Sequence, residues 1–211
     1  MFNYSDKTIA NIQFKMLELF RTIKADKMVK QDANNVASVK LANILSPDRT
    51  FLEPSEIVKE IYIIEITLTS KIVPTKFIDA FNKYINFQTL FKCFYNNECK
   101  YISSIKDFAE DKTKVLKVFE TDWGQKTKQE FPITTKLDFV FKETIKYITT
   151  ISFKQDETFS EYIERFEKIT KLQTEIEKQT KIMNAEKQPN FRMALNDKIK
   201  QMRKQLQVLE G

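Results

Sequence analysis

The sequence has no histidine and only two glycines, Gly124 and Gly211, and these absences exclude several classes of active site. Without histidine there is no Ser-His-Asp or Cys-His catalytic set, no imidazole metal ligand and no histidine pH switch. Without clustered glycines there is no phosphate-binding loop of the Walker or Rossmann type. Two cysteines, Cys93 and Cys99, complete neither a structural zinc site nor a disulfide framework. We therefore expect no cofactor and no bound metal.

Long apolar runs are also missing. No run approaches the roughly 20 residues that span a bilayer, and residues 1–7 lack the basic and apolar regions of a signal peptide. We therefore expect a cytoplasmic protein with no membrane partner. Apolar residues make up 42% and charged residues 30% of the 211, which predicts a folded chain with an ionised surface. The net charge of +6 favours acidic partners, nucleic acid among them.

The spacing of apolar residues predicts an α+β protein, α/β-like in part, with a small mixed sheet and flanking helices. Steps of three and four residues indicate helices, and β-branched runs bounded by turn residues indicate strands. We expect helices over 5–24, 36–45, 75–86 and 137–149, and strands over 57–68 and 114–121.

The dipeptide Asn96-Asn97 lies between two β-rich runs and predicts a tight hairpin, because asparagine tolerates the positive φ that such turns need. In a two-residue turn Phe94 pairs with Cys99. Cys93 and Cys99 then lie on opposite faces of the ribbon, so we expect them not to form a disulfide.

From Phe159 onward the helical spacing continues among many charges, and Pro189 suits the first turn of a new helix. This predicts two antiparallel helices with a turn near 188–190. We accordingly divide the chain into an N-terminal helical segment (1–50), an α/β core with its closing helix (51–152) and a C-terminal, coiled-coil-like helical hairpin (153–211). The second helix carries a strict heptad seam of apolar residues: Leu195, Ile199, Met202, Leu206 and Leu209.

The string EKQPNFRMALNDKIKQMRKQLQVL, from Glu186 to Leu209, resembles the end of an uncharacterised bacterial family, domain of unknown function four-three-nine-one. Pro189 departs from the family pattern, which has an apolar residue there. The segments EIYIIEITL, LFKCFYNNECKYISSIK and VLKVFETDW are similar to its central segments, so the resemblance covers about 54–211. It implies a setting beside DNA methyltransferases and helicases in restriction-like phage-defence clusters, and it implies no catalytic residues.

The basic tail is the first candidate binding surface. Residues 181–211 carry seven lysines and arginines against three carboxylates, which suits phosphates or an acidic protein surface. The alternative is the solvated face of an ordinary surface helix. The heptad seam likewise packs only on the preceding helix, or binds a partner or a second copy of the chain. The candidate basic residues are Lys187, Arg192, Lys198, Lys200, Arg203 and Lys204.

Two carboxylates and one tryptophan are the remaining candidates. Asp48 precedes the predicted central strand and Glu65 lies within it, as in restriction-type nucleases that hold Mg²⁺. Those enzymes add a lysine two residues after the strand glutamate, where this chain has Thr67, so the nuclease pattern is incomplete. Glu65 is otherwise a strand residue paired with a neighbouring lysine. Trp123, in a polar loop, is expected to be exposed and able to stack on a base.

These features predict a non-catalytic accessory subunit of a phage-defence module that docks onto a helicase or DNA methyltransferase through its hairpin. Direct nucleic-acid binding by the basic hairpin and the sheet face is one alternative. A metal-dependent nuclease-like fold, degenerate or active, is another. A homodimer also remains open.

Overall fold

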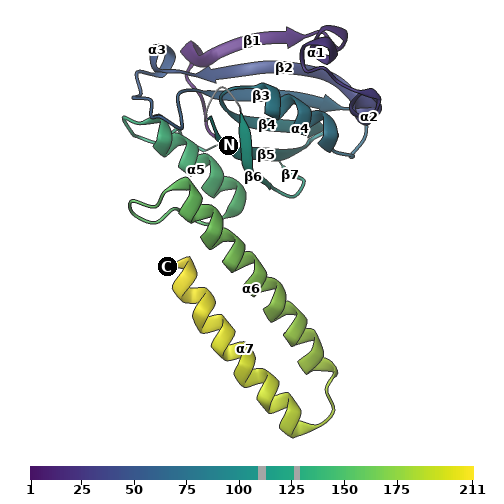
Figure 1. Cartoon of the computed structure of the whole chain (residues 1–211), viewed down its shortest axis with the longest axis vertical. Coiled ribbons are helices and arrows are strands. Elements are labelled where there is room, and N and C mark those ends of the chain that lie inside the picture. Colours follow the sequence, from purple (N-terminus) through teal and green to yellow (C-terminus); the bar gives the residue numbers. More distant parts are fainter. Residues whose placement is uncertain (109–112, 126–128) are drawn as a thin grey trace. The chain divides into compact units, whose positions relative to one another are not determined.

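The computed structural model describes residues 1–108, 113–125 and 129–211, and it divides the chain into two compact units. The first unit is Met1–Thr150 and holds the sheet. The second is Ile151–Gly211 and holds the two long helices (Figure 1). The α+β class predicted from the sequence is confirmed.

Within the described residues the first unit is built on one seven-stranded sheet, with strand order β1-β2-β3-β4-β5-β6 and with β7 also paired to β5. All neighbouring pairs are antiparallel except β3 and β4, which are parallel. The strands are β1 Ile9–Phe14, β2 Val36–Leu45, β3 Ile61–Leu68, β4 Gln88–Tyr95, β5 Glu98–Asp107, β6 Lys114–Glu120 and β7 Gly124–Gln125.

The β4–β5 hairpin has the predicted register. Phe94 pairs with Cys99 across the Asn96-Asn97 turn, and Asn96 adopts a positive φ of 51°. Cys93 and Cys99 are both buried, and no disulfide joins them. The turn chemistry alone therefore places these residues correctly.

Helices cover both faces of the sheet. Helix α4 (Thr75–Tyr84) makes the crossover between β3 and β4 and buries Phe77 and Phe81 in a core with Ile64 and Phe91. Helix α5 (Leu137–Thr149) has its predicted bounds and reaches the other face, where the Tyr147 ring packs edge-on against Tyr101, 5.4 Å between centroids. Short helices complete the unit: η1 Asp6–Thr8, α1 Met16–Thr22, α2 Lys27–Asp32, η2 Ala33–Asn35 and α3 Pro47–Thr50.

The helices expected over 5–24 and 36–45 are wrong. Residues 9–14 form β1 and 36–45 form β2, and a helix begins only at Met16. The pairing of β2 with β3 decides this, because Val39 and Leu41 are buried opposite Ile66 and Ile64. Tertiary pairing overrides a local helical pattern in such short segments.

The second unit is an antiparallel pair, α6 (Phe159–Ala185) and α7 (Pro189–Glu210), as predicted. Thr158 and Glu161 form a capping box that begins α6, and Pro189 lies in the first turn of α7. No helix in the described part of the chain is both long and apolar enough to cross a membrane.

Candidate functional site

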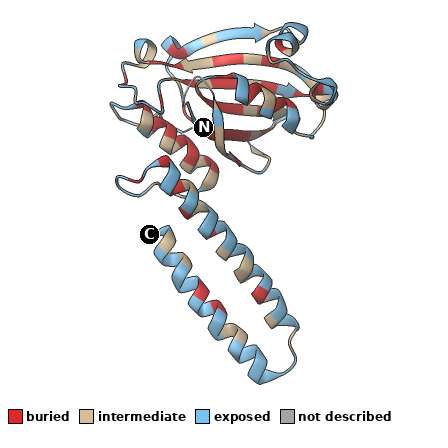
Figure 2. Ribbon diagram, in the orientation of Figure 1, coloured by how far each residue is buried: buried red, intermediate tan, exposed pale blue. Residues whose placement is uncertain are grey.

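The heptad seam of α7 lies against α6. Ile199 and Met202 of α7 are buried, and so are Ile169 and Gln179 of α6. The other seam residues, Leu195, Leu206 and Leu209, are half-buried. Most of the remaining surface of both helices is exposed (Figure 2). The seam therefore contributes chiefly to the packing of the hairpin.

Arg165 links the two helices at the open end of the hairpin, which is the end opposite the turn between α6 and α7. Its Nε and Nη2 donate to the Glu157 carboxylate at 2.6 and 2.7 Å, and Nη2 also donates to the Ser152 carbonyl at 2.7 Å. Its Nη1 donates to the Leu209 carbonyl of α7 at 3.1 Å. One guanidinium thus joins α6, the last turn of α7 and the segment that precedes α6.

The pKa of Glu157 reflects this arrangement. Burial opposes ionisation, but the hydrogen bonds from Arg165 and from the Lys154 backbone, together with the positive charge, hold the pKa below its usual value. The carboxylate therefore remains charged and paired at neutral pH.

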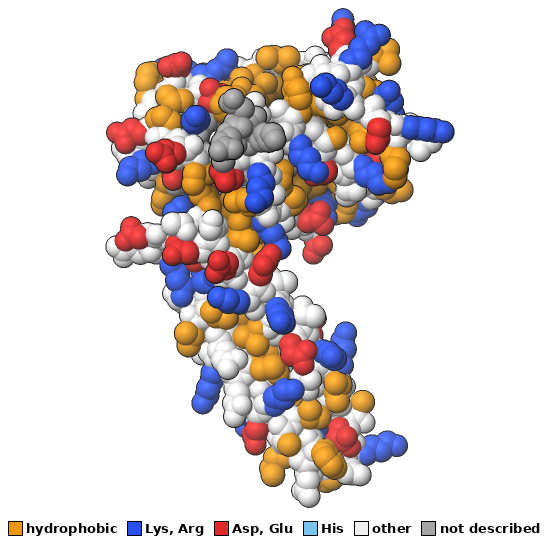
Figure 3. All heavy atoms as spheres, viewed as in Figure 1, with side chains coloured by type: hydrophobic (Ala, Val, Ile, Leu, Met, Phe, Trp, Pro, Cys, Tyr) orange, Lys and Arg blue, Asp and Glu red, His pale blue; other side chains and the backbone are white. Residues whose placement is uncertain are grey.

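Positive charge is concentrated on the hairpin. Between Lys168 and Lys204, ten lysines and arginines face four carboxylates, so this stretch carries the whole net charge of +6 and the rest of the chain balances to zero. All ten side chains are exposed, and blue side chains follow both helices in Figure 3. In this stretch, described throughout, the only ion pair joins Lys200 to Asp197 at 3.7 Å. The ten are Lys168, Lys171, Lys178, Lys181, Lys187, Arg192, Lys198, Lys200, Arg203 and Lys204.

The predicted basic residues of the tail do not all share one face. Arg192, Lys200 and Arg203 fall within about 80° of one another around α7, given 3.6 residues per turn. Around α7, Lys198 lies on the opposite side of the heptad seam from these three residues. Lys204 lies on the face of α7 opposite the seam. The first three therefore form a stripe that a single ligand can contact.

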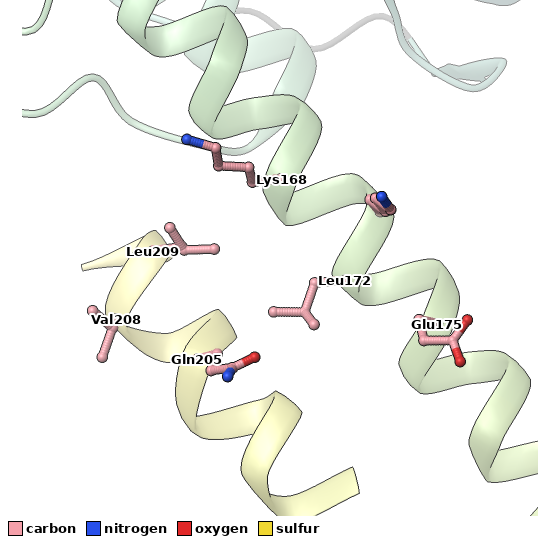
Figure 4. Close-up of a pocket in the computed structure, with 7 residues that line it drawn as sticks. Lys168, Leu172, Glu175, Gln205, Val208 and Leu209 are labelled. Atoms are coloured by element: carbon pink, nitrogen blue, oxygen red, sulfur yellow. The ribbon is translucent and has the colours of Figure 1, made fainter. Parts of the chain in front are cut away.

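An apolar groove opens between the two helices near the end of α7. It has a volume of about 570 Å³, and Leu172 of α6 and Leu209 of α7 point toward each other across it, with Val208 at its outer edge (Figure 4). Lys168 and Lys171 are among its lining residues. Val208 is 75% exposed, which is high for an apolar side chain beside a groove.

Residues 19–206 match the family described as Domain of unknown function (DUF4391). The chain belongs to this family. The match begins well before residue 54, where the resemblance read from the sequence became clear, and it includes most of the hairpin. No curated protein and no solved structure gives a significant match to the chain.

In this DUF4391 chain the structure does not bring the two candidate carboxylates together. Glu65 pairs with Lys40 across the sheet, whereas Asp48 lies beyond Leu45, the partner of Ile61. Ile61 and Glu65 are four residues apart along β3, which corresponds to a distance of about 13 Å along the strand. Asp48 instead lines a separate cleft of about 770 Å³. The described residues contain no group of three or more potential metal ligands.

Glu65 is already paired. Its carboxylate lies 3.0 Å from Lys40 Nζ and 3.7 Å from Lys92 Nζ, lysines of the two neighbouring strands. Lys71, the nearest lysine after Glu65 in the sequence, instead pairs with Glu98 at 2.7 Å. Glu65 of the DUF4391 chain therefore sits in a cross-strand ion-pair row.

The sheet aromatics belong mainly to the core of the DUF4391 chain. Tyr101 and Phe119 are buried. Trp123 is half-buried against the core cluster, with Lys71 Nζ 6.0 Å from its ring centroid. The sheet face thus offers few exposed aromatic side chains for stacking.

Sequence reasoning missed the contribution of α6 to the basic surface. The lysines at 168, 171, 178 and 181 follow helical spacing, which is a readable signal. Their significance depends on the hairpin, because only antiparallel pairing places them alongside the basic residues of α7.

Proposed function

We propose that this DUF4391 protein binds nucleic acid through the basic surface of its hairpin, from Lys168 to Lys204. The observation that carries the proposal is the concentration of ten exposed cations there, with one ion pair between them and the four carboxylates. Because α7 alone is 22 residues and about 33 Å long, these charges are spread along an extended surface. Duplex DNA carries one negative charge per about 1.7 Å, so it matches an extended row of cations.

The test is a charge-neutral variant of the stripe, Arg192→Gln with Lys200→Gln and Arg203→Gln. All three side chains are exposed, so the fold should persist. We expect binding of a fluorescent DNA duplex, measured by anisotropy, to weaken at least about tenfold, because three phosphate contacts are lost.

A matched control removes the same charge from the first unit. Lys27, Lys30 and Lys76 lie on α2 and α4 and are exposed. Their replacement by glutamine should leave duplex binding nearly unchanged. Equal weakening in both triple variants would mean that net charge alone, and no hairpin surface, is responsible.

Docking onto a protein partner is the second candidate function, and the apolar groove favours it. Leu172, Val208 and Leu209 offer apolar contact, and Lys168 and Lys171 lie beside them. The occupant that fits is an amphipathic helix of a partner with acidic residues on its flanks. The family resemblance points to a helicase or DNA methyltransferase in a phage-defence module as the source of that helix. Apolar docking should depend little on salt, which separates it from phosphate binding.

A further inference from the structure

A second basic and aromatic feature lies in the first unit, far in sequence from the hairpin. A cleft of about 440 Å³ opens between η1, α3 and the segment at Phe131. This volume is within the range of small-molecule sites. Its lining residues include two cations, Lys7 and Arg49, and no carboxylate, together with the rings of Tyr4, Phe51 and Phe131.

Phe51 is the unusual member of this cleft. Its side chain is 77% exposed, and its backbone takes the left-handed conformation with a φ of 59°. A phenylalanine is sterically strained in the left-handed conformation. Because the ring is exposed, no burial of apolar surface offsets that strain. Lys7 Nζ lies 4.8 Å from the centroid of the ring and covers one side. The high exposure leaves the rest of the ring available for stacking.

The cations are placed beside this ring. Arg49 is half-buried, and its Nη1 donates to the Ile9 carbonyl at 3.2 Å, which fixes the guanidinium at the cleft. The opposite wall is aromatic, because Tyr4 and Phe131 pack edge-on with centroids 6.1 Å apart. The phenol of Tyr4 is neutral near pH 7 at its ordinary pKa, and burial raises that pKa further, so the ring does not repel an anion.

We propose that this cleft binds a nucleoside phosphate, with the base stacked on Phe51 and the phosphate held by Lys7 and Arg49. Aromatic rings stack on any base, and lysine and arginine are the usual partners of phosphate. Two sources share this chemistry: a free nucleotide and an unpaired nucleotide of a nucleic-acid strand. The proposal does not depend on hairpin binding, because every residue of the cleft lies in the first unit.

The first arm of the test titrates the full chain with AMP and with inorganic phosphate in a calorimeter. We expect AMP to bind more tightly than phosphate, and Phe51→Ala to weaken AMP binding by about tenfold or more. Phe51→Tyr should retain binding. Tyr84→Ala is the control, since Tyr84 is an exposed aromatic on α4. These results would identify a free nucleotide as the ligand.

The second arm uses a short fluorescent oligothymidylate, with the Arg192/Lys200/Arg203 glutamine variant as background to remove the hairpin contribution. Loss of oligonucleotide binding on Phe51→Ala or Lys7→Gln, with weak AMP binding, would identify an unpaired strand nucleotide. The proposal is overturned if Phe51→Ala changes the affinity of neither AMP nor the oligothymidylate. It is also overturned if inorganic phosphate binds as tightly as AMP and the oligothymidylate. A failure of this kind would leave duplex binding by the hairpin unaffected.

Discussion

Lys106 is fully buried in the first unit, where lysine is rarely found without a carboxylate partner. Its Nζ donates to three backbone carbonyls at the end of α4 and the start of β4: Asn82 at 2.8 Å, Ile85 at 3.0 Å and Phe87 at 2.8 Å. Burial lowers the pKa of Lys106 to about 7. The ammonium supplies three donors, and it thus ends α4 with satisfied carbonyls.

Replacing Lys106 with methionine should therefore destabilise the first unit. Three carbonyls lose a buried donor, while removal of the desolvated charge offsets part of that loss, so we expect a net cost of about 2–4 kcal/mol in the free energy of unfolding. Urea unfolding of the full chain would measure it. Lys100→Met on the same strand is the control, since it loses one ion pair with Glu120 and should cost about 1 kcal/mol. Equal losses in the free energy of unfolding for the two variants would contradict this role of Lys106.

Glu157 and Arg165 predict a pH dependence for the hairpin. The pKa of Glu157 is lowered in the folded state, so its contribution to stability is present above the ordinary value of 4.5 and is lost as the pH falls through the folded value. Hydrogen exchange of the amides at the start of α6 and the end of α7 would report it. Protection should fall below about pH 4.5 in the wild type.

The Glu157→Gln variant supplies the control for that measurement. It should show reduced protection at neutral pH and little further loss in acid, because it has no carboxylate to titrate. A constant difference between the two proteins at all pH values would mean that the ion pair contributes nothing to the open end of the hairpin.

Among the elements, the groove between α6 and α7 gives the most direct test of protein docking. Val208→Asp places a negative charge at the groove, on a side chain already 75% exposed. If an acidic-flanked helix binds there, co-purification with that partner should be lost, while the helix content by circular dichroism stays the same. Ile72→Asp is the matched control, since Ile72 is 70% exposed in the first unit. Partner capture that survives Val208→Asp would rule out the groove.

The same elements show what the sequence could predict. The β4–β5 register and the bounds of α5 follow from local signals, the Asn96-Asn97 turn and a regular apolar stripe. The strands β1 and β2 do not, because Ile9 and Ile12 are half or more exposed and mimic a helical spacing with Met16. Only the partner strand β3 reveals β2, and that pairing is non-local.

The candidate site was predictable to a similar degree. The excess of lysine and arginine over carboxylates in residues 181–211 identifies the basic residues of α7, including Arg192, Lys200 and Arg203. Phe51 is not among the residues predicted from the sequence, although an aromatic residue between Pro47 and Pro54 in a polar turn is a usable signal. Its exposure beside Lys7 becomes visible only when η1 and α3 are placed together.

At the scale of the whole molecule, charge is divided unevenly along the chain. The stretch 168–204 holds the full +6, and the remaining residues, which include the whole sheet, are balanced. By unit, Met1–Thr150 carries a net charge of +4 and Ile151–Gly211 a net charge of +2, because the segments of the second unit that flank the stretch 168–204 are acidic. The local concentration of positive charge between Lys168 and Lys204 is the basis of the proposal that the hairpin contacts nucleic acid.

The most direct test is the salt dependence of duplex DNA binding by the full chain. If the hairpin binds phosphates, the logarithm of the binding constant falls linearly with the logarithm of salt concentration, with a slope of about −0.9 for each phosphate contacted. The Arg192/Lys200/Arg203 glutamine variant should show a slope smaller in magnitude by about three. An unchanged slope in that variant, or no duplex binding by the wild type at low salt, would contradict the proposed function.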